Sequence, residues 1–286
     1  MARKPTPRPT FDLPTRIPAG GGVHHTWGDA SAGFVHDEVL LSSAHLHALI
    51  FSMPGGGGWR HSPDNPVVFA ADELYHVLDG RLALIDPEAG EVADVVAGRS
   101  AVFGRDTWHH GRAWGTRPLR VLELMAPTPA AGASTAYARR RPYLPLESAR
   151  TADDGRLGAL GLDRPAGQAG ASFRVLGDED RIVRLEADLI VGILLSTTRL
   201  TAAIAELPAG GRSELRRYGG DLLLHALAGT AEVEIPDGVA AGRHRLDPGD
   251  TFILPLGASM RLHGRGPGDA RLLLGVAPSY LPDGRG

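Results

Sequence analysis

The sequence of 286 residues contains no cysteine. This absence excludes disulfides, thiolate metal sites and cysteine nucleophiles, so any metal must be bound by His, Asp or Glu. Aromatic residues are scarce, at 6%. The formal net charge is only −3, which gives no electrostatic reason to expect a nucleic acid or an anionic membrane as a partner.

Long hydrophobic runs are also missing. The longest apolar run, residues 187–195, is too short to span a bilayer and is interrupted by Asp188 and Gly192. Residues 1–17 contain basic side chains and four prolines without an apolar core, which is not the pattern of a secretory signal. We therefore expect a cytoplasmic protein with no membrane partner.

Glycine and proline, in contrast, are abundant, with 38 and 22 residues that lie between short apolar runs such as 47–51 and 81–85. Regularly spaced short strands bounded by turn residues predict an all-β sandwich or barrel. No segment has a long helical period of apolar residues, so we expect few, short helices, with residues 130–141 and 146–159 as candidates.

Two stretches of the chain follow one template. In the first, a Pro-Gly turn precedes the series Glu73, Gly80, Gly98 and His109. In the second, such a turn precedes Leu222, Gly229, Gly249 and Met260. The last residue follows its preceding glycine at the same spacing in both copies (98 to 109 and 249 to 260). Such self-similarity indicates a duplicated domain. Because Glu and His of the first copy become Leu and Met, we expect any chemistry in the first copy.

The repeat suggests a division of the chain into four parts. We expect an N-terminal tail over residues 1–20, a first domain over 21–145, a linker over 146–175 and a second, structural domain over 176–286.

The motifs of the first copy, Glu73 to Gly80 and Gly98 to His109, resemble the two signature motifs of the cupin superfamily. In the second copy, Gly249, Pro255 and Gly257 match the second motif until Met260 replaces its His. The first copy has Gly104 and Asp106 where the family has Pro and Gly. The chain thus resembles a bicupin: two tandem β-barrels of the jelly-roll, or double-stranded β-helix, type, the second without metal ligands.

The family's first motif also contains a His-x-His pair, which is absent here. The pair would fall at residues 66 and 68 or at 67 and 69, and the nearest upstream histidine is His61. The segment from Pro54 to Gly80 is longer than its counterpart from Pro208 to Gly229, so an extended loop would let His61 take a ligand position. The resemblance then implies a metal site of His61, Glu73 and His109. Four other histidines remain alternatives to His61, namely His45, His47, His76 and His110.

Strand alternation assigns faces to the first motif. Glu73 shares a face with Tyr75, whereas His76 points to the opposite side. The counterpart of Glu73 is Leu222, so we expect an inward carboxylate that needs a metal or an Arg as partner. The second interior should then be lined by Leu222, Leu224 and Met260.

The remaining histidines are assigned in the same way. His76 matches His225 in the second copy, so we expect a structural role for both. Only one of the adjacent His109 and His110 can point inward, and motif spacing favours His109, with an exposed strand end as the alternative. His24 and His25 precede the first domain and are expected on the surface.

The function that the resemblance implies is a metal-dependent enzyme. We expect a non-haem iron oxygenase or dioxygenase that acts on a small organic acid or phenolic compound, with Tyr75 and Arg60 as catalytic residues. Fe(II) is the expected ion, with Mn, Ni or Zn as alternatives. Metal-assisted isomerase, decarboxylase or lyase chemistry is a second hypothesis. A metal-free module for binding or sensing a small ligand is a third. The apolar second copy allows a homodimer.

Overall fold

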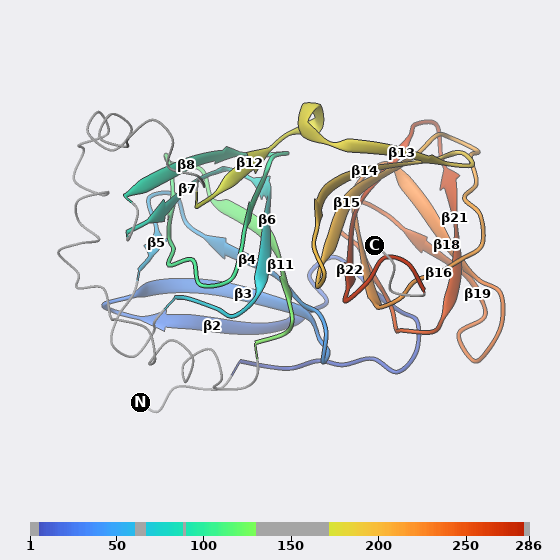
Figure 1. The fold of residues 1–286 in the computed structure, drawn as a ribbon, viewed down its shortest axis with the longest axis horizontal. Coiled ribbons are helices and arrows are strands. Elements are labelled where there is room, and N and C mark those ends of the chain that lie inside the picture. Colours follow the sequence, from blue (N-terminus) through green and yellow to red (C-terminus); the bar gives the residue numbers. More distant parts are fainter. Residues whose placement is uncertain (1–5, 61–66, 88–89, 130–171, 283–286) are drawn as a thin grey trace.

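The computed structural model describes residues 6–60, 67–87, 90–129 and 172–282. In these ranges the regular structure is β-strand except for one 3₁₀ turn, η1 (Asp178–Asp180). Figure 1 shows two barrels side by side, each built from a seven-stranded and a four-stranded sheet. The expectation of an all-β chain with two tandem cupin-type barrels is confirmed. The two segments expected to carry short helices, 130–141 and 146–159, lie outside the described residues.

The first barrel combines the sheet order β12-β9-β6-β11-β4-β3-β2 with the order β5-β10-β7-β8. Its strands are antiparallel to their neighbours. They are β2 (Val23–Asp29), β3 (Gly33–Ser42), β4 (His47–Met53), β5 (Gly58–Trp59), β6 (Asp72–Asp79), β7 (Arg81–Asp86), β8 (Glu91–Val96), β9 (Ser100–Phe103), β10 (His110–Ala113), β11 (Leu119–Ala126) and β12 (Arg174–Leu176).

The second barrel repeats this plan with the orders β1-β20-β17-β22-β15-β14-β13 and β16-β21-β18-β19. Its strands are β1 (Thr15–Ile17), β13 (Ile182–Glu186), β14 (Leu189–Ser196), β15 (Thr201–Leu207), β16 (Arg216–Arg217), β17 (Asp221–Ala228), β18 (Thr230–Ile235), β19 (Gly242–Leu246), β20 (Thr251–Leu254), β21 (Ser259–Arg265) and β22 (Ala270–Ala277).

Two short strands cross between the halves of the chain. β1, from the segment expected to be an N-terminal tail, pairs with β20 of the second barrel. β12, which the sequence places at the end of the linker, pairs with β9 of the first barrel. The registers are equivalent, because Ile17 lies opposite Thr251 as Leu176 lies opposite Ser100. Each seven-stranded sheet is therefore completed by residues that sequence reasoning had assigned elsewhere. Residues 146–171 of the expected linker lie outside the described ranges, and the domain boundaries stay a prediction.

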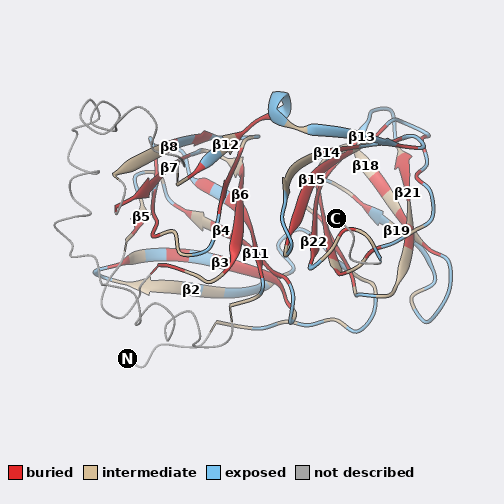
Figure 2. Ribbon diagram, viewed as in Figure 1, coloured by how far each residue is buried: buried red, intermediate tan, exposed pale blue. Residues whose placement is uncertain are grey.

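Three apolar clusters account for the core. One fills the first barrel, one fills the second, and a third lies between the two seven-stranded sheets. The third cluster includes Leu74 and Leu124 of the first barrel with Leu223 and Leu273 of the second. A Cβ on Gly275 of β22 would lie 2.6 Å from Leu124, which shows how closely the sheets approach. Figure 2 shows β6, β11 and β22 buried along most of their length.

This packing explains the continuous apolar runs in the sequence. A strand buried on both faces cannot show a simple alternation of apolar and polar residues. In β6, Tyr75 and Val77 belong to the first barrel's interior, and Leu74 belongs to the cluster between the sheets. Glu73 therefore faces the interior and His76 the interface, as the alternation predicted. Within the described residues, no helix has the length and apolar character needed to cross a membrane.

The crossing strand β1 provides a test of this architecture. Ile17 is 6% exposed and packs in the cluster between the sheets. We expect Ile17→Ala to lower the free energy of unfolding by about 2–4 kcal/mol, because it removes buried methyl groups and leaves a cavity. Ile182→Ala is the matched control, since Ile182 is 71% exposed, and should change stability by less than about 0.5 kcal/mol. Urea denaturation measures both, and equal effects would contradict the role of β1.

Candidate functional site

Buried Asp86 on β7 contributes a charge that is felt at His109. Five further ionisable side chains, among the described residues, interact in the interior of the first barrel. Four of them lie on strands: Asp37 on β3, Glu73 and Tyr75 on β6, and Glu123 on β11. Glu123 lies directly opposite Tyr75 in the β6–β11 ladder. The fifth, His109, immediately precedes β10 and is fully buried. Together they form the interior polar group.

The second barrel has an apolar residue at each equivalent position. The equivalents follow from strand register: Tyr75 opposite Glu123 corresponds to Leu224 opposite Leu274. Taken in chain order, the replacements of the five residues are Val191, Leu222, Leu224, Met260 and Leu274, and all five belong to the second interior cluster. The prediction that Leu222, Leu224 and Met260 line the second interior is confirmed. The fold itself thus does not require these polar groups.

His109 is held by two hydrogen bonds. Its Nδ1 lies 3.1 Å from the carbonyl oxygen of Thr107, and its Nε2 lies 3.0 Å from the Tyr75 hydroxyl. Because a carbonyl only accepts, Nδ1 carries the proton and Nε2 accepts from Tyr75. Burial lowers the pKa of His109 to about 4, so the imidazole is neutral near pH 7. The Nε2 lone pair of His109 can bind a metal ion, but in this structure it accepts the hydrogen bond from the Tyr75 hydroxyl.

The loop before His109 depends on an unusual residue. Asp106 has φ +70°, and the equivalent Gly257 has φ +92°. The left-handed backbone suits glycine, so the substitution of Asp for the family's Gly keeps the turn at the cost of some strain. This turn brings the next residues inward, so that the His109 ring lies 4.9 Å from the Phe103 ring between centroids.

Aromatic side chains surround Tyr75. The ring centroids of Phe103, Phe51 and Trp59 lie 5.1, 5.3 and 6.3 Å from that of Tyr75, in edge-to-face arrangements. Phe51, Trp59 and Phe103 thus form an aromatic wall around Tyr75. Edge-to-face contacts of this kind fix the orientation of the phenol.

Glu73 is the least satisfied member of the interior polar group. It is 1% exposed, and its Oε2 has no hydrogen-bond partner in the part of the chain that the structure describes. Burial raises the pKa of Glu73 well above its usual range, and the nearby charges of Glu123 and Asp72 raise it further. Glu73 therefore keeps its proton at pH values where an exposed carboxyl has lost it.

Glu123 and Asp37 extend the acidic character of the interior. Burial, and then the charge of Asp37, raises the pKa of Glu123. Burial also raises the pKa of Asp37, although the bond to His25 opposes this shift. The sequence analysis missed both residues. One available signal was the isolated charge of Glu123 within the apolar run 121–126.

The expected surface position of His25 is wrong. Its side chain is 7% exposed, and its Nδ1 lies 3.2 Å from Asp37 Oδ2. The reason is that residues 23–29 form β2, which pairs with β3 so that His25 lies opposite Asp37. Sequence reasoning had placed these residues before the first barrel, where no partner was apparent.

The other histidines occupy different environments. His61 lies outside the described residues, and His45 is exposed. His47 is buried, and its Nδ1 lies 3.0 Å from Ser42 Oγ. His110 is 4% exposed, so the alternative of an exposed strand end is wrong, because β10 lies between β5 and β7. Burial, the charge of His109 and that of Arg60 lower the pKa of His110 to about 3.

The donor set for a metal is partial in the described residues. Among them, no three His, Asp or Glu side chains lie close enough together to hold an ion. Two donors of suitable chemistry do belong to the interior polar group, the unpartnered Glu73 Oε2 and the His109 Nε2 lone pair. His61, which the resemblance implies as the third ligand, lies outside the described residues.

Comparison with known proteins identifies the fold. No protein-family model and no curated protein sequence matches this chain. Among solved structures, a variant of Bacillus subtilis oxalate decarboxylase matches with a TM-score of 0.64 and 14% identity, over 96% of this chain and 80% of that chain. The Lactobacillus farciminis oxalate decarboxylase, a formate complex, matches with a TM-score of 0.59 and 16% identity, over 98% and 90%.

A third structure carries the fold name. The cupin 2 conserved barrel domain protein from Leptotrichia buccalis matches with a TM-score of 0.52 and 11% identity, covering 88% of this chain and 92% of that chain. At such identities the likeness concerns the backbone alone. The chain has the cupin fold.

Proposed function

We propose that the first barrel is the site of a metal-dependent enzyme that acts on a small organic acid or phenolic compound. Glu73, His109 and His61 would hold one divalent ion, Fe(II) in the first instance. The observation that carries the proposal is the buried, unpartnered carboxyl of Glu73.

A buried carboxyl without a partner is expensive for a fold. Burying a polar group without a hydrogen bond costs roughly 1–3 kcal/mol by protein mutational measures. The second barrel avoids this cost with Leu222 in an otherwise equivalent strand. A group that lowers stability and has an apolar alternative on the same scaffold is a candidate for function, because active sites commonly trade stability for chemistry.

The Tyr75–His109 pair supports the same proposal. The imidazole is neutral at pH 7, as a ligand must be. With an ion on Nε2, the Tyr75 hydroxyl would have no acceptor on His109 and would donate a hydrogen bond to a substrate oxygen in the interior instead. Tyr75 would then orient the substrate against the aromatic wall. Arg60, whose charge is felt at His110, would bind the carboxylate or phenolate of the substrate.

Two reaction types fit this set of residues. A bound ion with open positions would supply O₂ activation in an oxygenase, or polarise a carbonyl oxygen in a decarboxylase. The fold likeness to two oxalate decarboxylases favours the decarboxylase as the second candidate. In that reaction, a carboxyl that stays protonated, such as Glu123, would deliver a proton to the carbon that loses CO₂.

Metal content tests the proposal. We expect about one ion per chain in protein purified without a His tag, because the second barrel has Leu222 and Met260 where the first has Glu73 and His109. Glu73→Ala, His109→Ala and His61→Ala should each lower metal occupancy and abolish turnover. His76→Ala is the control and should keep the ion, since His76 faces the other side of β6. Elemental analysis checks all four variants. A metal-free protein would favour the ligand-binding hypothesis, and two ions per chain would contradict the role of the apolar second barrel.

The cost of Glu73 can be measured directly. We expect Glu73→Leu, the residue of the second barrel, to raise the free energy of unfolding of chelator-treated protein by about 1–3 kcal/mol, because it removes a buried unsatisfied group. Glu73→Gln keeps a buried polar amide and should gain less. A destabilised Glu73→Leu variant would show that the carboxyl has a partner that stabilises the fold.

The pH dependence of stability gives an independent signature. The folded state holds the proton of Glu73 more tightly than the unfolded chain, in which the pKa of this carboxyl is near its ordinary value of 4.5. The unfolded state therefore binds fewer protons above this pH, and stability should fall as pH rises from about 4.5 toward the raised folded pKa. Denaturation series at several pH values should show a smaller fall in Glu73→Leu than in the unaltered protein.

A further inference from the structure

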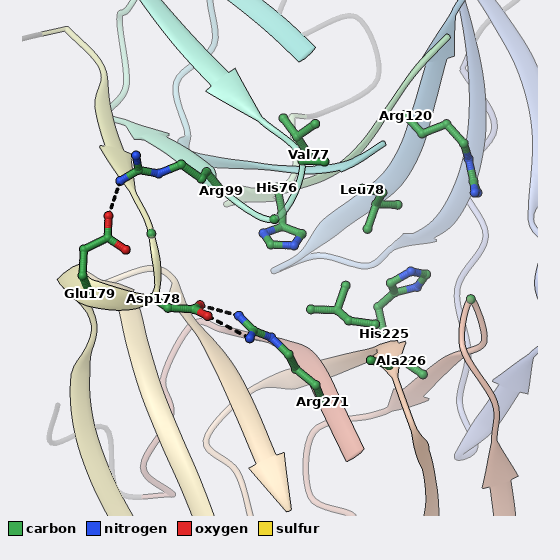
Figure 3. A pocket seen from close by; sticks show the side chains of 16 residues that line it. His76, Val77, Leu78, Arg99, Arg120, Asp178, Glu179, His225, Ala226 and Arg271 are labelled. Atoms are coloured by element: carbon green, nitrogen blue, oxygen red, sulfur yellow. Dashed lines mark hydrogen bonds and ion pairs between the residues drawn. The ribbon is translucent and has the colours of Figure 1, made fainter. Parts of the chain in front are cut away.

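A cavity of about 660 Å³ lies between the two barrels, on the side of β6 opposite to the interior polar group. Its lining includes His76 and Arg120 from the first barrel, His225 and Arg271 from the second, and Asp178 from η1. Figure 3 shows these side chains around the opening, with Arg271 bonded to Asp178. None of them belongs to the interior polar group.

The two barrels contribute matching groups to this cavity. His76 on β6 and His225 on β17 occupy equivalent positions, as do Arg120 on β11 and Arg271 on β22. Each histidine bonds through Nδ1 to a hydroxyl on the next strand, Ser100 for one and Thr251 for the other, at 2.9 Å in both cases. Both barrels have therefore kept the same polar side chains here, although their interiors differ at all five polar positions.

Each arginine acts across the interface. The charge of Arg271 is felt at His76, and that of Arg120 at His225. Both imidazoles have pKa values lowered to about 4, mainly by burial, and are neutral. The Nε2 atoms have no hydrogen-bond partner in the described part of the chain. When Ser100 or Thr251 donates its hydroxyl proton to Nδ1, the Nε2 of that ring carries a proton and is a donor.

The symmetry fails at the carboxylates that pair with Arg271. Glu206 lies 3.4 Å from Arg271, and its equivalent in the first barrel is Ser52. Arg271 is neutralised by two hydrogen bonds to Asp178, one of them at 2.9 Å. Leu176 on β12 and Ile17 on β1 are equivalent by strand register. Asp178 and Ala19 each lie two residues further along the chain, so Ala19 is the equivalent of Asp178. The position equivalent to the cavity-lining Asp178 therefore carries a methyl group, next to the lining residue Gly249, and no carboxylate.

Arg120, an exposed residue of β11, has no counter-ion among the described residues. Among the described residues its side chain makes no hydrogen bond or ion pair, whereas Arg99 is paired with Glu179 at 2.6 Å. The cavity lining contains three guanidinium groups, of Arg99, Arg120 and Arg271, against the two carboxylates of Asp178 and Glu179. Arg99 also lies 3.5 Å from Asp180, and Arg271 also lies 3.4 Å from Glu206. Arg120 is therefore the lining arginine without a carboxylate partner among the described residues, and it belongs to the half that lacks an equivalent of Asp178.

We propose that this interface cavity binds the carboxylate of a small organic acid, which pairs with Arg120 and accepts a hydrogen bond from His225 Nε2. In the other half of the cavity, Arg271 makes the same kind of arginine–carboxylate pair with Asp178 of this chain. Leu78 and Leu227 also line the cavity and would contact the apolar body of the ligand. The site needs no metal and is separate from the proposed metal site, because the two lie on opposite faces of β6.

Titration calorimetry of the full chain with benzoate, in buffer containing a chelator, tests this site. We expect saturable binding of one benzoate per chain, with benzamide, which lacks the charge, bound at least about tenfold more weakly. Arg120→Gln should weaken benzoate binding by at least about tenfold, because it removes the charged partner. Arg117→Gln is the matched control and should bind normally, since Arg117 is an exposed arginine paired with Asp79 that does not line the cavity.

A second variant tests the same site without replacing Arg120, so that a structural effect of the Arg120 substitution cannot explain the result. Ala19→Asp should supply Arg120 with an internal carboxylate, as Asp178 does for Arg271, and so weaken benzoate binding by at least about tenfold while the fold is kept. Absence of saturable binding would overturn the proposal, as would benzoate or phosphate binding that persists unchanged in Arg120→Gln. Benzoate binding lost in Glu73→Leu but not in Arg120→Gln would assign the ligand to the first barrel, and would also overturn it.

Discussion

Face-to-face packing of the two seven-stranded sheets is the constraint on which the rest of the structure depends. It buries the outer face of each sheet in an apolar cluster that includes Leu74 and Leu223. A strand such as β6 is then buried on both sides, and each residue belongs either to a barrel interior or to the interface. This division gives Glu73 and His76, only three positions apart, entirely different surroundings.

The two copies of the duplicated domain have different interiors, an apolar one in the second barrel and one with polar groups in the first. The second barrel fills its interior with apolar side chains, including Leu222, Leu224 and Met260, and gains the burial energy that such a core supplies. The first barrel keeps five polar groups in the same positions and loses part of that energy. Exchange of β1 and β12 between the halves, together with the interface cluster, couples the barrel with the polar interior to the more apolar one.

Equivalent residues of the two barrels differ in the barrel interiors and agree at the interface cavity. In the barrel interiors, polar groups survive in one copy only, which is the pattern expected when one copy carries a function and the other a structural role. At the interface, His76 with His225 and Arg120 with Arg271 persist in both copies, and the difference lies in the segment that precedes the next strand, where Asp178 corresponds to Ala19. The first difference removes a site from the second barrel. The second leaves one half of the interface cavity without its carboxylate.

The sequence by itself determined the all-β class, the repeat, the inward direction of Glu73 and Tyr75, the choice of His109 over His110 for the interior, and the opposite direction of His76. These follow from spacing and from strand alternation, which are local properties of the chain. Only the tertiary structure decided that Asp37, Glu123 and His25 join Glu73, that His110 is buried and that β1 and β12 complete the sheets. Those features depend on which strands pair, and pairing joins residues far apart in the chain, such as Ile17 and Thr251, whose separation carries no local pattern.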